Sequence, residues 1–290
     1  MLPSAAGDPG ASRTIRGMDP RHRHQRELVA LAITVVGLSR LLDGPLVWAV
    51  AALLFAAVWL GTRQVLAEGS LGYAPVPIEA SIIPSVAAIG ALGTMRVVPL
   101  GLALVPALFA AGWFLDLTVR LEARVHDRPT GMTAGDRTTL LAAALVASFL
   151  AFLGTATMVQ GGLAQPGPAN TELGPPISES GIVVVALADA LVGGLLGFRF
   201  SASRLAGRRD ALWAALTYAA AIAIAAGVLR AIGVPRLLFP ALLTLVFYLW
   251  DTVRGTAPSL RRDPRFIWQS VLLTALGVAV IAWNLGLRGS

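Results

Sequence analysis

The sequence predicts an all-α, polytopic integral membrane bundle of about nine transmembrane helices, arranged as one leading helix and two four-helix repeat units. Hydrophobic residues make up 56% of the 290 residues and charged residues only 13%, and the mean hydropathy is +0.73. A soluble domain needs a more polar surface than this composition can supply. The apolar residues also fall into runs near the length of about 20 that a helix needs to cross the hydrocarbon core.

The individual spans follow from these apolar runs. The first run is the weakest, because Arg40 and Asp43 crowd its end, and it is the one that we expect to be tilted or re-entrant. The residues before it are rich in Gly, Pro and Arg, so we expect 1–27 to be a disordered cytoplasmic tail. The nine predicted spans are 28–43, 44–63, 78–95, 97–119, 138–160, 181–199, 210–232, 235–253 and 267–287.

The arginines predict the orientation of these spans, since short cytoplasmic loops collect basic residues. All 23 basic residues are arginines, and an inside N-terminus with nine spans places 18 of them on the inner side. Removing the first span would move the arginines of the tail to the other side and abolish most of this bias. We therefore expect a cytoplasmic (inner) membrane protein with its N-terminus inside and its C-terminus outside. The outer side would keep Arg40, Arg96, Arg230, Arg236 and Arg288.

A shift of 134 residues aligns 83–120 with 217–254 without gaps, and the aligned segments share matched arginines, prolines and TVR ends. Equivalent spans would lie four helices apart and so would have the same orientation, which makes this a parallel repeat, unlike the inverted repeats of many transporters. The predicted division is a leading helix at 28–43, unit A at 44–160, an external Pro/Gly linker at 161–180 and unit B at 181–290.

Asp189 is the sharpest single feature, because no other charge lies between Gly181 and Phe198. A carboxylate at that depth must face the bundle interior, carry a proton or find a donor. It is therefore a candidate proton, cation or substrate contact, and the alternative is a structural hydrogen bond to a neighbouring helix. The spacing of Gly193 and Gly197 allows another helix to approach closely.

Arg96 and Arg230 occupy matched positions at the outer ends of their spans. Two such guanidinium groups could hold an anionic head group or carboxylate between them. Alternatively, they could extend to the interface and pair with Glu79, Asp43 or lipid phosphate. Arg230 could also reach toward Asp189.

Two carboxylates lie at the inner ends of matched spans, Asp116 with Arg120 at i+4 and Asp251 with Arg254 at i+3. These spacings predict interfacial ion pairs on one helix face. The catalytic alternative is a pair of carboxylates that binds a metal–diphosphate. Nine spans with such repeated acids resemble the intramembrane prenyltransferases, but those enzymes carry two aspartate-rich motifs, and each site here has one Asp.

The function that we expect is a small-molecule or ion transporter or permease, with Asp189 protonatable and Arg96 and Arg230 near the outer mouth. The alternatives are a non-catalytic membrane subunit or scaffold and, less favoured, a lipid-modifying enzyme. Cysteine is absent and the three histidines lie outside the apolar runs, so we expect no cofactor, no metal and no catalytic residue. The expected partners are anionic lipid head groups at the inner arginine clusters, a membrane partner or second copy, and no nucleic acid.

Overall fold

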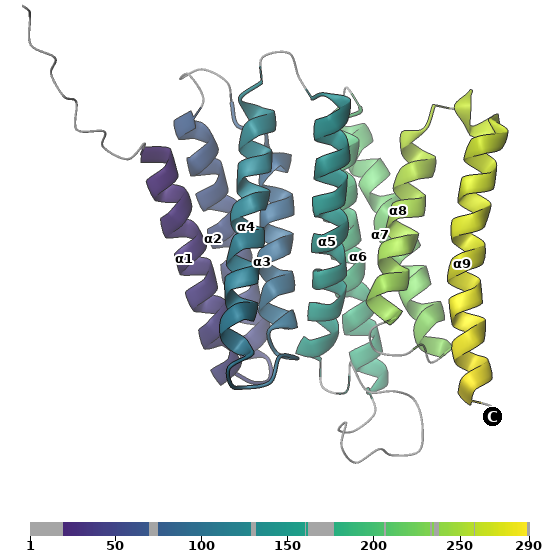
Figure 1. Cartoon of the computed structure of the whole chain (residues 1–290), viewed down its shortest axis with the longest axis horizontal. Helices are drawn as coiled ribbons and strands as arrows, with labels where there is room; N and C mark the ends of the chain where they lie inside the picture. The colour runs from purple at the N-terminus through teal and green to yellow at the C-terminus, as the bar shows by residue number, and fades with distance from the viewer. Residues whose placement is uncertain are drawn as a thin grey trace, which may run out of the picture.

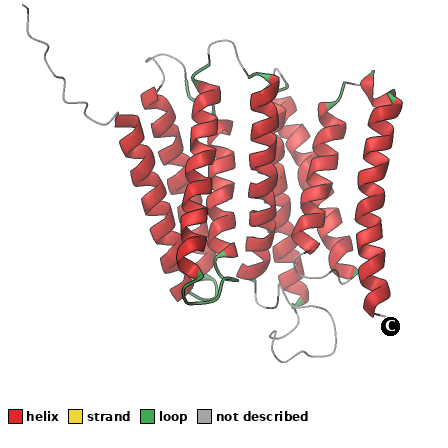
Figure 2. Ribbon diagram, viewed as in Figure 1, coloured by secondary structure: helices red, strands yellow, loops and turns green. Residues whose placement is uncertain are grey.

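A computed structural model describes residues 20–69, 75–128, 132–159, 161, 177–205, 207–232, 234, 238–257 and 259–288. Within these residues every regular element is a helix (Figure 2). The α-helices are α1 (Pro20–Leu38), α2 (Leu46–Gly69), α3 (Ile82–Thr94), α4 (Leu104–His126), α5 (Ala134–Met158), α6 (Glu179–Ala202), α7 (Arg208–Ala231), α8 (Leu238–Gly255) and α9 (Pro264–Arg288). Short 3-10 turns cover Ser39–Leu41, Ile78–Ser81 and Leu260–Arg262.

The helices stand side by side and alternate in direction, so that α1 begins at the upper end of the bundle and α9 ends at the lower end (Figure 1). The arginine-bearing ends of α4, α6 and α8 therefore share the upper end with the start of α1. This arrangement is compatible with a membrane location. The orientation of the termini remains a prediction from the arginine count.

Six helices among the described residues are long and apolar enough to cross a membrane: α2, α4, α5, α6, α7 and α9. The apolar segment Ile78–Thr94, which contains α3, is shorter, while α1 and α8 do not meet the same length and hydropathy requirement. The structure thus supports a helical membrane bundle. The six long apolar helices do not confirm the predicted count of nine spans or the division into one leading helix and two four-helix units.

Helix α1 begins at Pro20, so the prediction that 20–27 belongs to a disordered tail was wrong. The polar first turns of this helix are held by contacts with α2 and α4. Gln25 Nε2 donates to Oδ1 of Asp116 at 2.5 Å, and His24 Nδ1 lies 2.6 Å from a carboxylate oxygen of Glu68. The rest of the expected tail, 1–19, and most of the expected linker, 162–176, lie outside the described residues.

Glycines allow two pairs of helices to pack at very short range. A Cβ atom added to Gly93 of α3 would lie 2.2 Å from the Cα atom of Gly154 on α5. Added Cβ atoms at Gly193 and Gly197 of α6 would lie 2.6 and 2.4 Å from side-chain atoms of α7. The close approach predicted from the Gly193–Gly197 spacing is therefore confirmed, and α7 is the helix that uses it.

Two clusters of buried apolar residues fill the bundle. One cluster joins α1, α2, α3 and α4 around residues such as Leu54 and Leu92. The other joins α5, α6, α7 and α8 to parts of α3 and α4 around Phe152, Tyr218 and Phe247. Helix α9 packs mainly on α8 at one edge of the bundle (Figure 1).

Candidate functional site

Asp189 is fully buried between α5 and α6. The hydroxyl of Thr155 donates to its Oδ1 atom at 2.6 Å, while Oδ2 has no hydrogen-bond partner. The charge of Arg230 acts on this carboxylate, but the described contacts include no ion pair between the two. None of the cavities described below is lined by Asp189. This geometry is that of a polar contact between two helices.

Arg96 and Arg230 have separate surroundings. Arg96 donates to the backbone carbonyls of Ser39 and Leu42, at 3.2 and 2.9 Å, and to the carboxylate of Asp43 at 2.9 Å. It therefore fastens the α1–α2 connection to the end of α3. Arg230 lies over the ring of Phe239, with its guanidinium carbon 4.1 Å from the ring centroid.

Of the partners predicted for Arg96, the structure contains Asp43. Glu79 lies at the opposite end of α3 from Arg96, and beside the first residue of α7, whereas Arg230 lies at the other end of α7, so the suggestion that Glu79 pairs with Arg96 or Arg230 was wrong. The reason is geometric: a helix of this length separates its two ends by more than a side chain can reach.

Asp116 forms an ion pair with Arg120, as its i+4 spacing suggests. Asp251 does not use Arg254. Its Oδ1 atom accepts from the hydroxyl of Tyr218 at 2.7 Å, and its Oδ2 atom accepts from Arg204 Nη2 at 2.8 Å. Asp251 is buried while Arg254 is exposed, so the two side chains point in different directions.

Arg204 lies in the α6–α7 connection, where it is held by its hydrogen bond to Asp251. Burial by itself lowers the pKa of its guanidinium, but the hydrogen bond and negative charge of Asp251 outweigh it, so the pKa lies above its usual value. The guanidinium carbon also lies 5.7 Å from the ring centroid of Phe200. Asp116 of α4 and Asp251 of α8 thus have separate partners, and their geometry does not support a shared catalytic role.

A buried ion pair that the sequence did not reveal joins α4 to α6. Arg199 Nε and Nη2 donate to the two carboxylate oxygens of Glu122 at 2.9 and 2.7 Å. The side chain of Glu122 is 1% exposed and that of Arg199 is 7% exposed. The two residues lie 77 positions apart, so no helical spacing could have indicated the pair.

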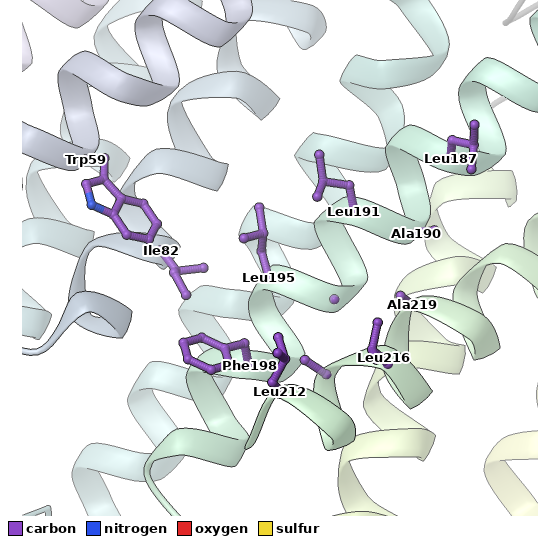
Figure 3. Close-up of a pocket in the computed structure, with 12 residues that line it drawn as sticks. Trp59, Ile82, Leu187, Ala190, Leu191, Leu195, Phe198, Leu212, Leu216 and Ala219 are labelled. Carbon is purple, nitrogen blue, oxygen red and sulfur yellow. The ribbon is translucent and has the colours of Figure 1, made fainter. Parts of the chain in front are cut away.

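An apolar groove opens on the side of the bundle between α2–α3 and α6–α7 (Figure 3). Its volume is about 500 Å³. Side chains from α6 line its length and those from α7 close one side, while Trp59 and Ile82 face them from α2 and the start of α3 (Figure 3). The other lining residues are Leu187, Ala190, Leu191, Gly194, Leu195, Phe198, Leu212, Ala215, Leu216 and Ala219.

A second, more polar cavity of about 280 Å³ adjoins the groove at the end of α6. Phe198 lines both cavities, which makes them neighbours. Glu79 and Arg208 are among the residues that line the polar cavity, between the residues before α3 and the α6–α7 connection. We refer to the groove and the adjoining cavity together as the amphipathic cleft, apolar along the helices and lined by charged residues at one end.

A third cavity, of about 360 Å³, lies between the beginning of α1 and the end of α4. Four arginines line it, together with His22, Gln25, Ala123 and Asp127: Arg21, Arg120, Arg124 and Arg128. Arg21 pairs with Asp127 at 2.5 Å, and Arg128 pairs with Asp136. The arginine cluster predicted in this part of the chain therefore surrounds a cavity, and part of its charge is neutralised within the protein.

Comparison of the chain with models of protein families, with curated proteins and with solved structures found no match.

Proposed function

We propose that the protein is a membrane transporter or permease for an amphipathic, lipid-like molecule, which enters the cleft sideways from the bilayer. The apolar groove between α2–α3 and α6–α7 is the observation that carries this proposal. It supports a pathway with an apolar lining between the two halves of the chain.

The lining of the groove favours a chain-like hydrocarbon substrate. Leucine, alanine, phenylalanine and tryptophan side chains offer contact surface without hydrogen-bonding groups. In a bilayer such a groove gains nothing from the hydrophobic effect, because lipid tails are equally apolar, so binding depends on packing and on the polar end of the ligand. The charged cavity at the end of α6 provides such a polar contact.

This proposal does not use Asp189 as a proton site. The carboxylate has a donor in Thr155 and is closed off from the groove, whose lining residues on α6 include its neighbours Leu187, Ala190 and Leu191 but not Asp189 itself. Proton coupling through Asp189 remains the alternative form of the transport hypothesis, and its unpartnered Oδ2 atom is the observation in its favour.

A fluorescent phospholipid in proteoliposomes tests the proposal. Dithionite, which bleaches only the outer leaflet, reports whether the protein moves lipid between leaflets. We expect the wild type to accelerate exchange and Leu191→Trp, which fills the groove, to slow it severalfold. Leu272→Trp is the matched control, because this leucine of α9 is as exposed as Leu191, 68% against 64%, but lies outside the groove.

Two outcomes would overturn the proposal: wild-type exchange no faster than that of protein-free vesicles, or Leu191→Trp as fast as wild type.

A second candidate function is that of a non-catalytic membrane subunit. Helix α9 favours it, because this helix packs mainly on α8 and exposes large side chains such as Trp268 and Trp283. Stoichiometric co-purification of a partner that is lost on deleting α9 would support this candidate, and purification of the chain alone would count against it.

A further inference from the structure

We infer that the amphipathic molecule is a zwitterionic aminophospholipid, whose ammonium group is bound by Glu79 and whose phosphate is bound by Arg208. This inference rests on the proposed function, since it names the class of lipid that the cleft would take. It depends on two opposite charges that line one cavity at the end of an apolar groove.

Glu79 carries a negative charge that the protein leaves without a direct partner. Its side chain is half-buried, and it forms no hydrogen bond or ion pair with the described residues. The charge of Arg199 interacts with that of Glu79, but its Nε and Nη2 groups donate to Glu122. A half-buried carboxylate at the edge of an apolar region is costly unless it is paired, so a cationic group of a ligand would stabilise it.

Arg208 supplies the opposite charge. It is the first residue of α7, it is exposed, and it forms no hydrogen bond or ion pair with the described residues. Its guanidinium can bind a phosphate through two parallel hydrogen bonds. The beginning of α7 also directs free backbone N–H groups and the positive end of the helix dipole toward the same region.

The arrangement of charges matches the order of groups in such a lipid. A primary ammonium follows the phosphate after a two-carbon linker, and the acyl chains extend from the other side of the phosphate. With the phosphate at Arg208 and the ammonium at Glu79, the acyl chains would pass Phe198 into the groove. A phosphatidylglycerol would leave Glu79 unpaired, and a phosphatidylcholine has no N–H to donate to it.

Native mass spectrometry of the full-length protein tests this assignment. The protein is titrated with phosphatidylethanolamine, phosphatidylcholine and phosphatidylglycerol that have identical acyl chains. We expect the wild type to retain phosphatidylethanolamine about tenfold better than phosphatidylglycerol, the factor that one charge-assisted hydrogen bond provides. Glu79→Gln should make the two lipids nearly equal, and Arg208→Gln should weaken all three.

Arg209→Gln is the matched control, because it removes the same charge from the adjacent, exposed position of α7, which does not line the cavity. It should keep the wild-type preference. Equal retention of the three lipids by the wild type, or an unchanged preference in Glu79→Gln, would overturn the inference. If the wild type retains the three lipids equally and Leu191→Trp binds none of them, only the head-group assignment is refuted. The groove then still stands as the lipid-binding site. If Leu191→Trp binds every lipid as the wild type does, the proposed function itself fails.

Discussion

The ion pair between Glu122 and Arg199 offers the most quantitative test of how the bundle is held together. Both side chains are almost fully buried, and both guanidinium hydrogen bonds end on the two oxygens of one carboxylate. Replacing one partner leaves the other charge buried and unpaired, which costs about 3–5 kcal/mol. We therefore expect Glu122→Gln and Arg199→Met each to lower the free energy of unfolding by about 3 kcal/mol or more.

The double variant separates pairing from burial. Combining Glu122→Gln with Arg199→Met removes two desolvated charges together with their attraction, and such replacements cost far less than leaving one charge unpaired. The double variant should thus be far more stable than the sum of the two single losses implies. Unfolding by dodecyl sulfate in mixed micelles, followed by circular dichroism, measures each free energy.

An exposed pair provides the reference for this measurement. Arg23 and Glu27 lie one turn apart on α1, at 2.9 Å, with side chains 73% and 56% exposed. Replacing Arg23 with glutamine should cost about 0.3–0.5 kcal/mol, as is usual for surface pairs at this spacing. If Glu122→Gln costs no more than this reference, or if the double variant loses the full sum of the single losses, the reasoning about the buried pair is refuted.

Gly93→Val should prevent stable folding, seen as loss of a monodisperse elution peak, because its side chain would collide with the backbone of α5. Gly227→Ala, on α7 with nothing near the added Cβ atom, should raise stability by up to about 1 kcal/mol. Asp189→Asn should leave lipid exchange and its pH dependence unchanged, since the site is a helix contact; a lost pH dependence would restore the proton-site hypothesis. A membrane-impermeant maleimide should label Leu102→Cys in intact cells and Arg209→Cys only after lysis, and the reverse pattern would invert the predicted topology.

The positions of the helices could be predicted from the sequence, because a membrane span is a local property: about 20 consecutive apolar residues. The predicted run 181–199 matches α6 (Glu179–Ala202), and 210–232 matches α7 (Arg208–Ala231). The prediction was wrong where stability depends on another helix. The polar turns of α1 fold because Gln25 and His24 find partners on α4 and α2, and no local pattern contains that information.

Charge pairs show the same limit. The spacing of Asp116 and Arg120 places both on one face of α4, and they pair. The spacing of Asp251 and Arg254 is just as suitable, but Asp251 faces the interior, where Tyr218 donates to one of its oxygens and Arg204 to the other, in a less polar environment. Hydrogen bonds there are stronger than at the surface. The sequence could therefore place Asp251 at the end of its helix, but it could not indicate that the carboxylate is buried or which groups donate to it.

The packing of the helices also bears on where the units of the predicted repeat would begin. Helix α1 packs on α2 and α4, and four helices later α5 packs on α6 and α8 in the same order. If the units began at α2 and α6, α9 would have to pack on α7 as α5 packs on α3. Among the described residues α9 instead has α8 as its main helical neighbour. If the chain contains a repeat, this packing favours α1–α4 and α5–α8 as the equivalent groups, with α9 added at the edge. In that division the amphipathic cleft lies between equivalent pairs of helices, because α2 and α3 are the second and third helices of one group and α6 and α7 are those of the other.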